Sequence, residues 1–229
     1  MTARMNFQME LEQLHNRLAE MGEHVENTID QVFRALEGKD QELLGTIIAG
    51  DRVIDDMERA IEAKCLSLIT RQQPVASDLR VVTATLKVVT DIERIGDQAV
   101  DIAELALRNK QYSLYLISKP MPELIHSAKD MVHCAVDAFI QNNQEAAGQI
   151  IKMDDVVDDL FNHVKDEVVQ MLRTDKMQDQ SGERKADPDC LVDVLMIAKY
   201  LEKIGDHAVN ICDWEMFRET GAIDSVRLL

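Results

Sequence analysis

The chain carries one twelve-residue pattern twice: ERIGDQAVDIAE at residues 93–104 and EKIGDHAVNICD at residues 202–213. Seven of the twelve positions are identical, which indicates a tandem duplication. In each copy the residues spaced three or four apart are apolar or small except for one glutamate, Glu93 or Glu202. Each copy therefore predicts a helix with a carboxylate on its core-facing stripe. Because a carboxylate beside a core is costly unless a cation or a hydrogen-bond donor meets it, the pattern indicates one cation site per copy.

The sequence around the two copies is typical of an all-α protein. Glycine and proline are scarce, at 9 and 4 of 229 residues, and apolar residues recur with helical spacing. This spacing predicts six long helices, over residues 7–37, 41–73, 77–110, 122–141, 144–174 and 188–217. Asp187-Pro188-Asp189 is a helix start signal, residues 111–121 are the expected hinge between halves, and residues 175–186 are an expected loop.

A second repeated motif supports the duplication. Asp51 and Asp55 stand four residues apart, and so do Asp154 and Asp158, at an offset of 103 residues. The two copies of the twelve-residue pattern are offset by 109 residues, and a longer loop before Pro188 accounts for the difference. Each half is thus a three-helix unit with one Asp-x-x-x-Asp and one Glu-x-x-x-Asp.

The charge of the chain excludes several classes of partner. The formal net charge is −17, from 42 acids and 25 bases, and no run of lysines or arginines interrupts it. Such a surface repels phosphate backbones and anionic lipids, so neither nucleic-acid binding nor membrane insertion is expected. No apolar run approaches membrane-spanning length and the N-terminus has no signal-peptide pattern, which predicts a cytoplasmic protein.

The four cysteines are widely spaced and form no C-x-x-C pair. They are interpreted as small hydrophobic residues in a reducing compartment, without disulfides or a zinc knuckle. They are Cys65, Cys134, Cys190 and Cys212.

The repeated acids form the candidate metal site of each half. Residues four apart on a helix lie on one face, with Cβ atoms roughly 5–6 Å apart, so two pairs on facing helices present four carboxylates to one point. Oxygen ligands of this kind select hard cations such as iron(III), manganese, magnesium or calcium, with zinc also possible. The candidate ligands are Asp51, Asp55, Glu93 and Asp97 in one half, and Asp154, Asp158, Glu202 and Asp206 in the other. Asp101 and Asn210, one turn further on, are weaker candidates because the copies differ there.

A simpler interpretation is that these acids are solvated helix faces. With 42 acids in the chain, several pairs at this spacing are expected by chance. What favours metal binding is that two pairs recur together in both halves, with Glu93 and Glu202 on apolar stripes. Gly96 and Gly205 fit a close approach of helices beside such sites.

No catalytic constellation is evident in the sequence. It has no glycine-rich phosphate loop, no Ser-His-Asp grouping and no cysteine with an activating partner. Glu12-x-x-His15 and Glu123-x-x-His126 match the Glu-x-x-His element of di-iron proteins, but their offset fits neither repeat, so they are interpreted as coincidental.

The chain resembles the PhoU family, the cytoplasmic regulators of bacterial phosphate uptake and phosphate-starvation signalling. The resemblance covers essentially the whole chain. It is carried by the doubled Glu-Arg/Lys-Ile-Gly-Asp, by Asp51/Asp55 and Asp154/Asp158, by QPVASDLR at 73–80 and by LEQL at 11–14. The second half has no copy of the ASDLR turn.

The resemblance implies two tandem, pseudo-symmetric three-helix bundles, with domain limits at residues 1–112 and 118–218. It further implies metal clusters on the paired acids, with iron in a multinuclear cluster expected first and zinc or another divalent cation as alternatives. A homodimer is expected. The implied function is negative regulation without catalysis, by contact with the ATPase subunit of a phosphate ABC transporter and with a membrane sensor histidine kinase.

Two other functions stay open at this point. A di-metal carboxylate enzyme, an oxidase or hydrolase, would need an open coordination position in a substrate-sized pocket and a general acid or base. A purely structural dimer would bind no metal.

Overall fold

The computed structural model describes residues 3–109, 120–175, 187–223 and 226–227. The first half forms α1 (Ala3–Gly38), α2 (Gln41–Ala49), α3 (Arg52–Gln72) and α4 (Ser77–Arg108). The second half forms α5 (Pro120–Gln141), α6 (Gln144–Ile150), the 3-10 turn η2 (Ile151–Met153), α7 (Asp154–Asp175) and α8 (Pro188–Thr220). A short antiparallel pair, β1 (Ala222–Ile223) and β2 (Val226–Arg227), follows α8.

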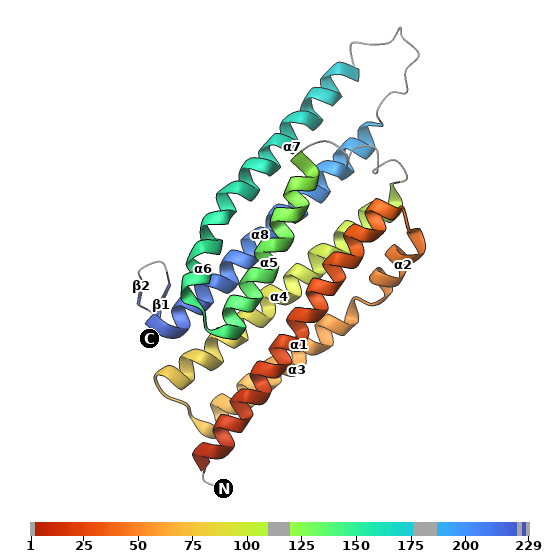
Figure 1. Ribbon diagram of the computed structural model, residues 1–229. Coiled ribbons are helices and arrows are strands. Elements are labelled where there is room, and N and C mark those ends of the chain that lie inside the picture. Colours follow the sequence, from red (N-terminus) through yellow and green to blue (C-terminus); the bar gives the residue numbers. More distant parts are fainter. Residues whose placement is uncertain (1–2, 110–119, 176–186, 224–225, 228–229) are drawn as a thin grey trace.

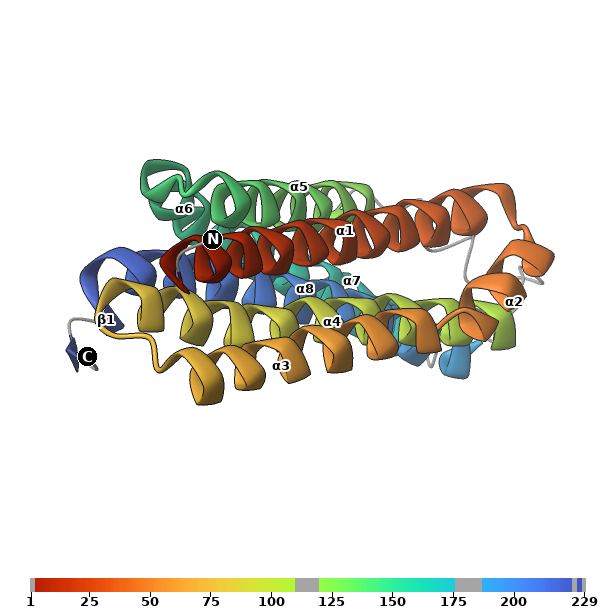
Figure 2. The ribbon, with the colours of Figure 1, turned by 90° about the horizontal axis from the view of Figure 1, so that it is seen from below.

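Two three-helix bundles lie side by side along the molecule (Figure 1). One consists of α1, α3 and α4, and the other of α5, α7 and α8. Helices α4 and α8 run antiparallel between them and make the most extensive contact of any two elements described (Figure 1). Helices α1 and α5 also lie side by side, which Figure 2 shows from below. The predicted all-α fold of two tandem three-helix bundles is confirmed.

Two of the six predicted helices are wrong as continuous elements. The helix expected over 41–73 is interrupted after Ala49, where the backbone N–H of Gly50 bonds to the carbonyl oxygens of Thr46 and Ile47 at 3.1 and 3.0 Å. The helix expected over 144–174 is interrupted by η2. A 3-10 turn or a single glycine shifts the apolar period too little for the pattern to reveal it. The short helices α2 and α6 pack against α4 and α8 respectively, while α3 and α7 begin anew as long helices.

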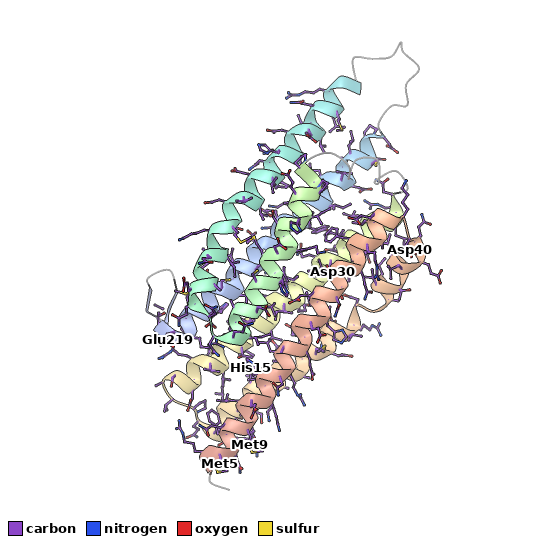
Figure 3. The ribbon with its side chains drawn as sticks, in the orientation of Figure 1. Met5, Met9, His15, Asp30, Asp40 and Glu219 are labelled. Carbon is purple, nitrogen blue, oxygen red and sulfur yellow. The ribbon has the colours of Figure 1, made fainter. Side chains whose placement is uncertain are left out.

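Two equivalent helix caps, which the sequence analysis did not predict, begin α2 and α6. Asp40, in the turn between α1 and α2 (Figure 3), accepts a hydrogen bond from the backbone N–H of Leu43 at 3.0 Å. Asn143 accepts one from the N–H of Ala146 at 3.1 Å, at the start of α6. Side-chain caps of this kind satisfy N–H groups that a helix cannot satisfy internally, so the second helix of each half begins with the same kind of cap.

The expected connections are only partly described. The predicted hinge 111–121 is wrong at its end, because Pro120 and Met121 are buried residues of α5. The rest of that hinge, and residues 176–186 of the predicted loop, lie outside the described residues. The start signal at Asp187 is confirmed, since its side chain accepts from the N–H of Asp189 at 3.1 Å and Pro188 is the first residue of α8.

The buried side chains form one continuous core through both bundles. It includes Ile54, Ile61, Cys65 and Leu68 on one face of α3. Cys190 and Cys212 are also buried, whereas Cys134 is exposed on α5.

Candidate metal sites

The first candidate site lies where α3 begins alongside α4. The interruption at Gly50 places Asp51 directly before α3, and Asp55 follows one turn later. Carboxylate oxygens of Asp51, Asp55 and Asp97, the last on α4, all lie within 4.8 Å of one another. Burial and the neighbouring carboxylates raise the pKa of Asp51 and of Asp97 above their usual values.

Glu93 lies beside this group but is not one of the three. Its side chain is 14% exposed, and its Oε2 atom is buried without a hydrogen-bond partner. Burial, and then repulsion from Asp97 and Glu58, raise the pKa of Glu93 to about 7. The Nε atom of Arg94 at 3.5 Å offsets only part of this effect.

Two further acids of the first half belong to this environment. Glu58, on α3, bonds to the Thr90 side chain and lies near Asp55, and the sequence reading missed it. Its position, three residues after Asp55 on the same helix face, was the signal that could have found it. Asp101 lies near Asp51, and the hydroxyl of Tyr200 on α8 hydrogen-bonds to its carboxylate.

The second candidate site lies at the start of α7, alongside α8. Asp154 and Asp158 on α7 interact electrostatically with Glu202 and Asp206 on α8. The Oδ1 atom of Asp154 is buried without a hydrogen-bond partner, and burial followed by repulsion from Asp158 raises its pKa. In the part of the chain that the structure describes, three carboxylate oxygens approach within 4.8 Å only at the first site.

Cations of the protein lie in both sites, but they approach more closely in the second. In the first, Arg59 lies 3.2 Å from Asp55 and Arg94 lies 3.4 Å from Asp97. The Nζ atom of Lys199 lies 2.6 Å from both carboxylate oxygens of Glu202. Lys203 forms an ion pair with Asp206, and its Nζ atom lies 3.6 Å from Glu202. The first site has Arg94 at the position equivalent to Lys203, and Thr90 at the position equivalent to Lys199.

Both glycines of the repeated pattern pack against the helix that carries the paired aspartates. A Cβ atom on Gly96 would lie 2.9 Å from Cδ1 of Ile54, and one on Gly205 would lie 3.2 Å from Cγ1 of Val157. Small residues at these positions let α4 and α8 approach α3 and α7 closely enough for the acids of both helices to meet.

The histidines lie elsewhere. Burial lowers the pKa of His15, with Arg218 as its charged neighbour, and His126 pairs with Asp130 at 3.3 Å, so the two Glu-x-x-His elements are not brought together with the paired acids. The Nδ1 atom of His207 lies 2.9 Å from Oδ1 of Asp91, across the contact between α8 and α4.

The donor set of both sites is all oxygen. Such ligands suit hard cations, and several carboxylates in one place repel one another unless protons or cations neutralise them. Burial and repulsion raise the pKa values of Glu93 and Asp154, and one carboxylate oxygen of each is buried without a hydrogen bond, which a bound cation would compensate.

Fold and sites together define a class of protein: two tandem three-helix bundles, each with a carboxylate cluster between two of its long helices. The chain matches the PhoU domain family over residues 18–106 and again over 121–214, and therefore belongs to the PhoU family. The limits of 1–112 and 118–218 that the sequence predicts for the two domains remain a prediction.

Relatives extend over nearly the whole chain. A protein of Clostridium acetobutylicum, named phosphate-specific transport system accessory protein PhoU homolog, is 37% identical over 216 residues, which cover 94% of each chain. The phosphate-specific transport system accessory protein PhoU of Escherichia coli K12 is 32% identical over 232 residues, covering 97% of this chain and 92% of that one.

Solved structures have the same fold. The phosphate transport system regulatory protein PhoU from Streptococcus pneumoniae superimposes with a TM-score of 0.83 at 27% identity, covering 95% of this chain and 98% of that one. PhoU from Pseudomonas aeruginosa gives a TM-score of 0.83 at 30% identity, covering 94% and 100%. Among the described helices of this chain, none is both long and apolar enough to cross a bilayer.

Proposed function

We propose that this protein is a negative regulator of phosphate uptake and of phosphate-starvation signalling. The observation that carries the proposal is the match of both halves to the PhoU domain, together with relatives named as accessory or regulatory proteins of phosphate transport. The function of those relatives is transferred to this chain because the similarity spans both domains and nearly the full length of each relative.

The proposed mode of action is contact in the cytoplasm with the ATPase subunit of a phosphate ABC transporter and with a sensor histidine kinase. The protein would act as a homodimer, in keeping with the family resemblance. The net charge of −17 favours binding of this protein to basic surface patches on such partners. Contacts between exposed charges weaken as salt rises, because exposed charges are screened over about 8 Å at physiological ionic strength.

We further propose that both acidic clusters bind metal ions, with iron in a multinuclear cluster as the first candidate and zinc or another divalent cation as alternatives. Asp51, Asp55, Glu93 and Asp97 would hold the metal in the first half. Asp154, Asp158, Glu202 and Asp206 would hold it in the second. A bound cation would supply the positive charge that these carboxylates lack, and so would hold α3 against α4 and α7 against α8.

A di-metal carboxylate enzyme finds less support. Cavities of about 590 and 210 Å³ are lined, among the described residues, by Arg108, Asp193 and their neighbours and by Glu26, His133 and theirs, and none of the eight paired acids lines either of them. Because the relatives are named as accessory or regulatory proteins, we propose regulation without catalysis. Turnover of oxygen or of a phosphoester by the metal-containing protein would favour the enzyme instead.

The test is deletion of the gene in a strain that carries a phosphate-starvation reporter. In high phosphate we expect the reporter to switch on, and expression of the intact protein to restore repression. In parallel, the purified protein should retain the sensor kinase and the transporter ATPase subunit at low salt, and less of each at high salt. A deletion that leaves repression intact, with neither partner retained, would contradict the proposal.

A further inference from the structure

Besides Asp101 and Asn210, the two candidate sites differ at two neighbouring pairs of equivalent positions. Helices α3 and α7 are related by an offset of 103 residues, and α4 and α8 by 109. With these offsets Glu58 of the first repeat corresponds to Phe161 of the second, and Thr90 corresponds to Lys199. An acid in one repeat is thus replaced by an aromatic ring in the other, and a hydroxyl by an ammonium group.

In the first repeat, Glu58 adds a negative charge beside the proposed ligands. Glu58 is held by the Thr90 side chain and lies close enough to Glu93 to repel it. Among the described residues, the cations that pair with the proposed ligands are Arg94, with Glu93 and Asp97, and Arg59, with Asp55, and their side chains are 54% and 68% exposed. The Oε2 atom of Glu93 therefore remains buried and without a hydrogen bond.

In the second repeat, Lys199 adds a positive charge beside the proposed ligands. Lys199 lies with its Nζ atom 5.1 Å from the centre of the Phe161 ring, which holds the ammonium group over the site. From there it donates to both oxygens of Glu202, whose side chain is 12% exposed, and it also interacts with Asp158. Glu202, which occupies the core-facing position equivalent to Glu93, thus already has a cation of the protein's own.

We propose that Lys199 is a tethered competitor of the metal at the second site, so that the two sites bind hard cations with unequal affinity, the first more tightly. This inference rests on the proposed metal binding. An incoming cation at the second site must displace the ammonium group from the carboxylate of Glu202 and break two charge-assisted hydrogen bonds, whereas Oε2 of the equivalent Glu93 at the first site accepts none. Lys199 is therefore the residue that sets the difference between the repeats.

The experiment measures Mn²⁺ binding to the metal-free full-length protein by calorimetry and by electron paramagnetic resonance of the bound ion. Asp97→Asn isolates the second site and Asp206→Asn isolates the first. On the Asp97→Asn background, Lys199→Thr gives the second site the residue of the first, and we expect its affinity to rise at least about tenfold, the size of one charge-assisted hydrogen bond. The reciprocal Thr90→Lys, on the Asp206→Asn background, should weaken the first site by a similar factor.

Two controls separate competition from other effects. Lys199→Arg retains the positive charge and should leave the second site weak. Lys87→Thr makes the same change in net charge at an exposed position of α4 and should leave the affinity of the second site unchanged. Circular dichroism of each variant shows whether it remains helical, and the reciprocal variant tests the inference through the other repeat if Lys199→Thr loses its fold.

The outcomes distinguish the inference from the proposal on which it rests. Unequal sites whose difference disappears in Lys199→Thr would support it. Two sites of equal affinity, or a second site that Lys199→Thr does not tighten, would overturn the inference and leave metal binding intact. No Mn²⁺ binding by the unmodified protein or by any variant would overturn metal binding at these sites, and the inference with it.

Discussion

At the scale of single residues, Glu93 is the acid whose burial opposes its ionisation most clearly. It occupies a core-facing position of α4, where burial and two neighbouring acids favour its protonated form. A carboxyl group whose pKa is higher in the folded than in the unfolded protein takes up a proton on folding. Its contribution therefore lowers the stability of the fold progressively as pH rises from about 4.5, through the folded pKa of about 7.

Glu93→Gln should remove this pH dependence. In the presence of a chelator, we expect the variant to be more stable than the unmodified protein at pH 8 by about 1 to 2 kcal/mol, and to lose this advantage towards pH 5. The figure is smaller than the whole shift would give, because solvent screens the part of the side chain that it reaches. Denaturant unfolding at several pH values measures the difference, and a difference that stays constant with pH would contradict the assignment.

The candidate ligands could be predicted from sequence because they recur in both repeats at a fixed helical spacing. Glu58 could not be found by that route, since its counterpart Phe161 is not an acid. Lys199 was missed for the same reason, because its counterpart is Thr90. A comparison of the repeats can therefore identify only the residues that both halves share, whereas the contacts of Glu58 and Lys199 are evident only in the structure.

At the scale of elements, the long helices were predictable and their interruptions were not. Apolar periodicity located α1, α4, α5 and α8 to within a few residues. It joined α2 to α3, and α6 to α7, because the break at Gly50 and the turn at 151–153 barely change the phase of the apolar stripe. Those breaks have a functional consequence, since each places an acid of the candidate site, Asp51 or Asp154, at the start of a new long helix.

Close packing between elements gives a second prediction. A Cβ atom on Gly22 of α1 would lie 2.6 Å from Cγ1 of Val136 on α5, and the branched valine side chain is stiff in a helix. Gly22→Ala should therefore destabilise the protein by about 1–3 kcal/mol, despite the higher helix propensity of alanine.

A matched substitution provides the control for Gly22→Ala. Gly45, inside α2, has no atom within 4 Å of the position that a Cβ would occupy. Gly45→Ala should raise the free energy of unfolding by up to about 1 kcal/mol. Thermal or denaturant unfolding measures both, and equal effects of the two substitutions would contradict the close approach of α1 to α5.

At the scale of the whole molecule, polar contacts fasten the two repeats together along α4 and α8. At one end Arg108 forms an ion pair with the buried carboxylate of Asp193. At the other, Nε of Arg80 donates to the carbonyl oxygen of Arg218 at 3.0 Å. Between them, Asp91 accepts hydrogen bonds from across the interface, including one from Nδ2 of Asn210 at 3.0 Å. The two bundles should therefore unfold as one cooperative unit.

A buried ion pair near the end of α8 gives a further prediction. Glu215 and Arg218 are 1% and 8% exposed, and the guanidinium group of Arg218 also donates to the carbonyl oxygen of Phe139 on α5 at 2.9 Å. Arg218→Met would leave the carboxylate of Glu215 buried without its partner and should cost about 3–5 kcal/mol. Replacing Glu215 by Met as well should restore most of the loss, because well-packed apolar residues can substitute for a buried pair. Calorimetry follows both variants, and a single variant as stable as the unmodified protein would disprove the role of the pair.

The central claim, that the paired acids of both repeats hold metal ions, is tested most directly by elemental analysis of protein purified without a histidine tag and without chelators. The unmodified protein is predicted to retain metal. The double variant Asp97→Ala with Asp206→Ala should keep its helical circular dichroism and lose most of that metal, because one ligand of each cluster is gone. Equal metal content in the two proteins, or no metal in the unmodified one, would contradict the claim.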